Sequence, residues 1–134
     1  MKRLILSIPV LIILSSCEIN VVQPMYDVRN QVVGSYTMKE YSNTYDHFVY
    51  YDLSISKSQY DPDQIILYNF YAAGISVNAW FDGRQVTIPQ QTVNGYRVEG
   101  VGSYQGNGLT CNYSVKDLYE NSVTDFCEST ALVN

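Results

Sequence analysis

The chain has 134 residues, of which 46% are hydrophobic and 16% charged, and its formal charge is −5 at pH 7. This length fits one domain, because domains usually contain about 100–200 residues. The hydrophobic content and the aromatic residues exclude a disordered acidic tail. The negative charge argues against nucleic acid as a partner, since phosphate binding needs a basic face.

The first sixteen residues have the features of a signal peptide. Lys2 and Arg3 make a basic start, and residues 4–14 are apolar except for Ser7 and Pro9. This stretch is too short to cross a hydrocarbon core of about 30 Å as a helix. We therefore expect residues 1–16 to be cleaved.

Cys17 follows the small residues Ser15 and Ser16, and this arrangement resembles the bacterial lipobox. In that motif the cysteine is lipidated and becomes the new N-terminus. The alternative is an ordinary signal peptide that ends near a cysteine. We expect a lipid-anchored protein of the bacterial cell envelope, on the outer membrane and either periplasmic or surface-exposed, with the inner membrane as the alternative. Residues 17–31 would form a tether and residues 32–134 a β-barrel domain.

The chain after residue 32 alternates between apolar and polar residues, which predicts half-buried strands. In residues 49–56, for example, Val49, Tyr51, Leu53 and Ile55 share one face. We predict strands at residues 34–41, 49–56, 64–71, 75–79, 84–88, 95–104, 109–115 and 123–128. About eight short antiparallel strands favour an all-β, up-and-down barrel, with a sandwich as the alternative.

Turn residues separate these strands. Asp61, Pro62 and Asp63 predict a tight turn, and the Asp82–Gly83 pair predicts a hairpin. Residues 105–108 predict a second hairpin. Pro89 lacks an N–H group, so we expect it to end its strand or to lie at a sheet edge.

Cys111 and Cys127 remain when Cys17 is lipidated. If residues 109–115 and 123–128 form a hairpin, the spacing places the two cysteines opposite each other. In an oxidising compartment a disulfide is then the favoured interpretation, and it would stabilise the fold by about 3 kcal/mol. The alternative is a pair of buried free thiols.

The sequence contains no recognisable catalytic or metal-binding motif. His47 is the single histidine, and it has no nucleophile motif beside it. Asp61 and Asp63 superficially suggest a calcium loop, but Ala72 stands at the twelfth position, where such a loop has a glutamate. We therefore expect no enzyme activity, no cofactor and no metal.

Tyrosine is unusually frequent, with thirteen residues. The alternation predicts that Tyr36, Tyr51, Tyr96 and Tyr113 point inward, either to fill the core or to line a ligand pocket. Tyr41, Tyr50, Tyr104 and Trp80 are predicted to point outward.

Several segments resemble the small calycin-like (lipocalin-like) lipoproteins of gut Bacteroidetes-type bacteria. They are residues 65–70, 77–83, 86–91 and 95–102, together with a Gly-x-aromatic opening at Gly34 and Tyr36, where tyrosine replaces the usual tryptophan. The resemblance covers residues 34–127 and implies a calycin-like barrel.

The sequence is compatible with two functions. The first is a membrane-anchored, non-catalytic binding module for a small apolar ligand or a glycan. The alternative is a surface-acting inhibitor or assembly component that has a filled barrel and binds an envelope protein.

Overall fold

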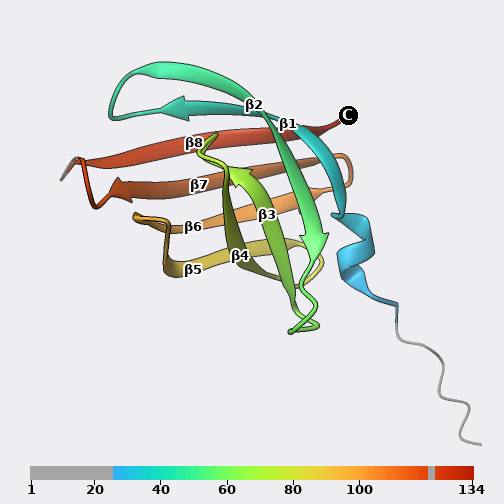
Figure 1. Cartoon of the computed structure of the whole chain (residues 1–134). Helices are drawn as coiled ribbons and strands as arrows, with labels where there is room; N and C mark the ends of the chain where they lie inside the picture. Colours follow the sequence, from blue (N-terminus) through green and yellow to red (C-terminus); the bar gives the residue numbers. More distant parts are fainter. Residues whose placement is uncertain (1–25, 121–122) are drawn as a thin grey trace, which may run out of the picture.

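The computed structural model describes residues 26–120 and 123–134, which form a short 3-10 helix, η1, followed by eight antiparallel strands (Figure 1). Each strand pairs with its neighbours in sequence, and β1 also pairs with β8, so the sheet closes into an up-and-down barrel. The architecture agrees with the expected calycin-like barrel, and closure leaves the sheet without a free end strand. The bounds are η1 Val28–Gln31, β1 Gly34–Ser42, β2 His47–Lys57, β3 Gln64–Phe70, β4 Ile75–Phe81, β5 Gln85–Val93, β6 Tyr96–Gln105, β7 Gly108–Asp117 and β8 Thr124–Val133.

Each of the predicted strands is present. The alternation of apolar and polar residues in the sequence corresponds to an alternation of buried and exposed residues along the strands. In β4, for example, Ile75, Val77, Ala79 and Phe81 are buried, whereas the residues between them are exposed. The signal peptide, Cys17 and residues 17–25 lie outside the described residues. Among the residues that are described, no helix is long and apolar enough to span a membrane.

Helix η1 covers one end of the barrel, and it is formed by residues that were expected to belong to the tether. Val32 is fully buried below it, and the Tyr36 hydroxyl donates a hydrogen bond of 2.6 Å to the Val32 carbonyl. The Tyr104 hydroxyl donates to the Gln31 carbonyl at 2.7 Å. These contacts hold the helix across the barrel opening, so we call this the closed end.

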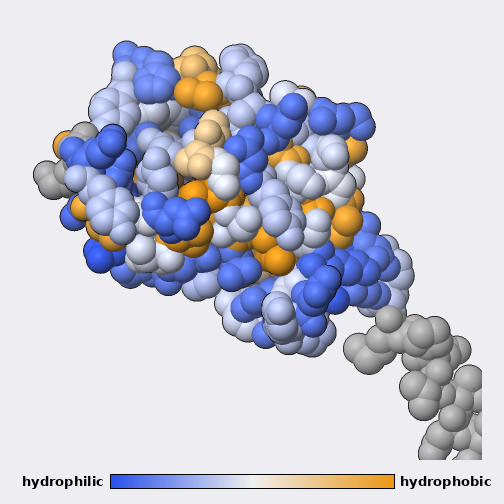
Figure 2. Space-filling view, viewed as in Figure 1, coloured by the Kyte–Doolittle hydropathy of each residue, from blue (hydrophilic) through white to orange (hydrophobic). Residues whose placement is uncertain are grey.

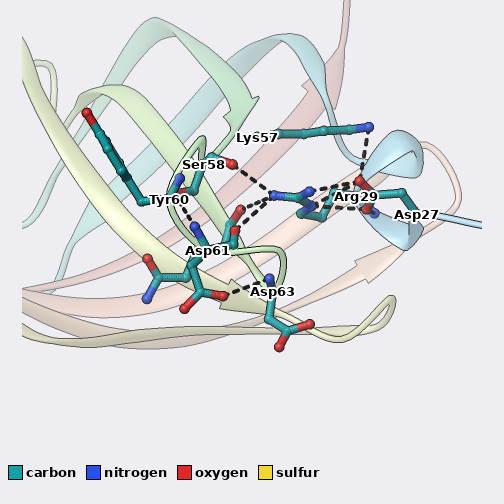
Figure 3. Close-up of polar contacts among 8 residues, drawn as sticks. Asp27, Arg29, Lys57, Ser58, Tyr60, Asp61 and Asp63 are labelled. Carbon is teal, nitrogen blue, oxygen red and sulfur yellow. Dashed lines mark hydrogen bonds and ion pairs between the residues drawn. The ribbon is translucent and has the colours of Figure 1, made fainter.

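Arg29 joins η1 to the loop between β2 and β3 (Figure 3). Its guanidinium is paired with the carboxylate of Asp27, and this pairing lowers the pKa of Asp27 well below its usual range. The same guanidinium donates to three backbone carbonyls at 3.0–3.2 Å, those of Ser58 and Asp61 in the loop and that of Gln64 at the start of β3. A buried arginine with these partners is satisfied, and it fixes the closed end.

Two glycines of β6 allow the barrel wall to curve closely against β7. A Cβ atom at Gly100 would lie 2.5 Å from the Cβ of Tyr113, and one at Gly102 would lie 2.5 Å from the Thr110 carbonyl oxygen. Any larger residue would force the strands apart. The side chains of Tyr113 and Cys111 occupy the space that these glycines leave.

Pro89 and Tyr104 differ from the sequence-based predictions. Strand β5 does not end at Pro89, because a bulge between Ile88 and Gln91 lets the strand continue to Val93. A bulge accommodates the missing N–H group. Strand β6 pairs with β7 without a register shift, so Tyr104 shares the inward face with Tyr96 and packs against the core. Trp80 is exposed as predicted.

The predicted disulfide between Cys111 and Cys127 is absent, and both residues are buried free thiols. Strands β7 and β8 are shifted by two residues relative to the expected hairpin: Cys111 pairs with Ser129, and Cys127 pairs with Tyr113. The two cysteines are therefore diagonal neighbours. The Cα atoms of such a pair lie about 7–8 Å apart, which is too far for a disulfide without backbone movement. Burial raises the pKa of the Cys111 thiol to about 12 and also raises that of Cys127.

Candidate functional site

Within residues 26–120 and 123–134, no helix covers the end of the barrel opposite η1, and we call it the open end. The connections β1–β2, β3–β4, β5–β6 and β7–β8 lie there (Figure 1). The Leu118 N–H donates to the Gly95 carbonyl at 2.8 Å, so the last two of these connections are in contact. Both buried carboxylates among the described residues, those of Glu40 and Asp125, lie toward this end.

A group of buried and half-buried polar side chains lies inside the barrel near the open end, and we call it the interior polar cluster. Its members come from β1, β2, β7, β8 and the β3–β4 connection: Glu40, Ser42, Tyr51, Tyr71, Tyr113 and Asp125. Glu40 and Asp125 are only 3% and 4% exposed. Two buried carboxylates in a small barrel are costly unless hydrogen bonds satisfy them.

Hydroxyl groups satisfy both carboxylates. The Tyr51 hydroxyl donates to Oε1 of Glu40 at 2.9 Å and lies 3.4 Å from the Tyr113 hydroxyl. Asp125 accepts hydrogen bonds from the Ser42 hydroxyl at Oδ1 and from the Tyr71 hydroxyl at Oδ2. Within the described residues, no buried side-chain polar atom lacks a partner.

Burial changes the protonation of this cluster. It raises the pKa of Glu40 to about 7, and the negative charge of Asp125 adds to the effect. Burial also raises the pKa values of Tyr51 and Tyr71, which lie beside these carboxylates. The tyrosines therefore stay protonated and act as donors, and Glu40 changes its charge close to neutral pH.

The β3–β4 connection positions Tyr71 through an unusual backbone. Tyr71 and Ala72 have positive φ angles of 61° and 51°, which residues with a Cβ atom seldom adopt. Such a conformation costs about 1–3 kcal/mol and persists only when its surroundings compensate. The hydrogen bond from Tyr71 to Asp125 provides part of that compensation.

Above the interior polar cluster lies a cavity of about 290 Å³, which we call the cup. This volume is at the lower limit of typical ligand pockets, so a ligand would have to be small. The cup combines three tyrosines, three carboxylates and two valines: Tyr45, Tyr71, Tyr96, Val115, Asp117, Glu120, Val123 and Asp125. Asp125 and Tyr71 belong to both the cup and the cluster.

The four tyrosines predicted to line a ligand site separate into three groups. Tyr96 lines the cup, where its ring lies 6.1 Å from that of Tyr71. Tyr51 and Tyr113 belong to the interior polar cluster below it. Tyr36 is almost fully buried at the closed end and fills the core, where burial raises its pKa to about 12.

Four members of the interior polar cluster, Glu40, Ser42, Tyr71 and Asp125, were not predicted as site residues from the sequence. A signal for three of them was present, because Glu40 and Ser42 continue the inward alternation of Tyr36 and Met38. Asp125 likewise stands two residues before the buried Cys127. Tyr71 follows the end of β3, so strand alternation does not predict its direction.

A larger hollow of about 520 Å³ lies on the outer wall of the barrel, beside Lys39, Tyr41 and Phe48. Its aromatic side chains already cover each other, since the Tyr41 and Phe48 rings are 4.8 Å apart and the Lys39 ammonium lies over the Phe48 ring. His47 is exposed near the β1–β2 connection. The cup is the stronger candidate because its wall includes a buried carboxylate.

No model of a known protein family matches this chain, and no curated protein matches it significantly in sequence. The candidate site therefore rests on the geometry of the chain itself.

Proposed function

We propose that the protein is a lipid-anchored, non-catalytic binding module of the bacterial cell envelope, related to the calycin-like lipoproteins, that holds a small polar ligand in the cup. The observation that carries this proposal is the polarity of the barrel interior. One end is closed by η1 over an apolar core, whereas the other leads through the cup to buried hydroxyl groups and carboxylates. The sequence is compatible with an apolar ligand or a glycan, and the polar lining of the cup favours a polar ligand over an apolar one.

Native mass spectrometry of the protein purified from bacterial envelopes tests the proposal. An additional mass that disappears on unfolding would support an occupied cup. The variant Tyr96→Leu should reduce that occupancy, whereas Tyr60→Leu should not, because Tyr60 is 98% exposed in the β2–β3 loop at the closed end. Equal occupancy in both variants would place the ligand elsewhere and contradict the proposal.

The lipid anchor has a separate test. The variant Cys17→Ser should release the protein into the soluble fraction or leave it as an unprocessed precursor. A mature form that stays bound to membranes without the cysteine would contradict the lipoprotein assignment.

A second candidate function is surface binding of an envelope protein. Strands β2 and β3 pair only from Ser54 to Lys57 of β2, so the first half of β2 pairs with β1 alone. Phe48 and Tyr50 lie in that half and are 56% and 63% exposed. Figure 2 shows that hydrophobic and hydrophilic residues are interspersed on the face of the molecule that is turned to the viewer. Stoichiometric co-purification of a protein that is lost in a Phe48→Ser, Tyr50→Ser double variant would favour this function.

A further inference from the structure

The cup brings aromatic rings and carboxylates together around one small space. The rings of Tyr71 and Tyr96 are 6.1 Å apart with an interplanar angle of 61°, so they form two walls that meet at an angle. Tyr45 adds a third aromatic side chain from the β1–β2 connection. The π face of an aromatic ring is negative and attracts a cation that lies within about 6 Å of the ring centre.

The part of the cup lining that the structure describes contains carboxylates but no basic residue. Asp117 is held by the backbone, because its Oδ1 accepts hydrogen bonds from the N–H groups of Tyr119 and Glu120. Arg97 and Lys116 lie close in sequence to the cup, but they pair with each other across β6 and β7 on the face opposite to Val98 and Val115. The basic side chains Arg97 and Lys116 are thus on the outer wall, whereas Asp117 of β7 lies in the cup.

The arrangement of the acids favours an organic cation over a metal ion. Within the described residues, no three His, Cys, Asp or Glu side chains lie close enough together to hold a metal. Asp125 is also occupied at both oxygens by Ser42 and Tyr71. Carboxylates spread over a wall with aromatic rings suit a larger cation whose charge is distributed over several carbon-bound groups.

We propose that the ligand of the cup is a small organic cation with an alkylated ammonium group, an inference that rests on the proposed function. The ammonium would lie against the rings of Tyr71 and Tyr96. Glu120, which is exposed at the rim, would add long-range attraction. The apolar part of the ligand would contact Val115 and Val123.

The test compares choline with 3,3-dimethyl-1-butanol, which has nearly the same shape and no charge. Both are titrated by calorimetry into the whole protein purified in non-ionic detergent. We expect choline to bind and the neutral analogue to bind at least about fivefold more weakly, since a cation–π contact accounts for that difference or more. Choline binding should also weaken as salt concentration rises.

Variants locate the binding. Tyr96→Leu and Glu120→Gln should each weaken choline binding, the first by about fivefold or more. The matched controls Tyr60→Leu and Asp63→Asn, in the β2–β3 loop at the closed end, should leave the affinity unchanged. Glu120 is exposed, so its substitution leaves the fold intact; thermal unfolding of each variant checks this.

The other outcomes separate this inference from the proposed function. Equal binding of choline and its neutral analogue would overturn the cation inference. The cation inference would also be overturned if choline failed to bind while a neutral sugar, such as N-acetylglucosamine, bound and Tyr96→Leu weakened that binding. In both cases the cup would still be a binding site. If no probe binds and the purified protein carries no additional mass, both proposals are overturned.

Discussion

Glu40 should make the protein less stable as the pH rises through neutrality. The residue is 3% exposed and accepts a hydrogen bond from Tyr51, and burial raises its pKa from 4.5 to about 7. In the unfolded chain the same group ionises at its ordinary pKa. Between these two values the folded protein therefore binds more protons than the unfolded chain, and its free energy of unfolding falls as the pH rises.

The magnitude follows from the size of the shift. Each pKa unit corresponds to about 1.4 kcal/mol, so the change from 4.5 to about 7 corresponds to about 3 kcal/mol. Solvent that enters through the open end would screen the group and reduce this to about 2–3 kcal/mol. The full stability is present below about pH 4.5, and the loss is complete above about pH 7.

The variant Glu40→Gln removes this titration while keeping the size of the side chain and an oxygen for the Tyr51 hydroxyl. At about pH 4 the variant and the wild type should have similar free energies of unfolding. At about pH 8 the variant should be more stable by about 2–3 kcal/mol. Urea unfolding followed by circular dichroism, repeated across this pH range, measures the difference.

Glu99→Gln is the matched control, because Glu99 is exposed on β6 and its substitution removes the same formal charge. It should follow the wild-type pH dependence. If the wild type and Glu40→Gln instead give parallel curves between about pH 5 and about pH 8, Glu40 is not buried as a neutral acid, and the description of the interior polar cluster is wrong.

Three further predictions concern the closed end, the thiols and the barrel wall. Arg29→Met should lower the free energy of unfolding by about 2–4 kcal/mol in urea titrations, because three backbone carbonyls lose a charged donor. An unchanged value would contradict the role of Arg29 in fixing η1. Cys111 and Cys127 should react with a thiol reagent only after unfolding, and reductant should not change the melting temperature. A disulfide between them would instead leave both cysteines unreactive in urea until reductant is added. Gly100→Ala should destabilise the protein by about 1–3 kcal/mol through overpacking. Thermal unfolding measures this, with Val101→Ala at an exposed position as the control. Similar stabilities of the two variants would show that β6 and β7 can separate without cost.

The candidate site was less predictable than the strands because its main residues break the rule that strand prediction uses. Glu40 and Asp125 stand at inward positions of β1 and β8, but a carboxylate at such a position is normally interpreted as a strand end or an outward residue. Only the hydroxyl groups of Tyr51, Tyr71 and Ser42 make these positions acceptable, and each lies at least 11 residues along the chain from the carboxylate that it contacts. No local pattern indicates such long-range compensation.

What the sequence determined by itself was the set of strands and turns. The period-two alternation and the turn residues, such as Asp82 and Gly83, act over a few neighbouring positions, so they can be interpreted without knowing the fold. The tertiary structure decided the two-residue shift in the register of β7 against β8 and the bulge at Pro89. It also decided which end of the barrel η1 closes and where the interior polar cluster lies. These depend on packing between residues far apart in the chain, and in a closed barrel every register must be compatible with all the others.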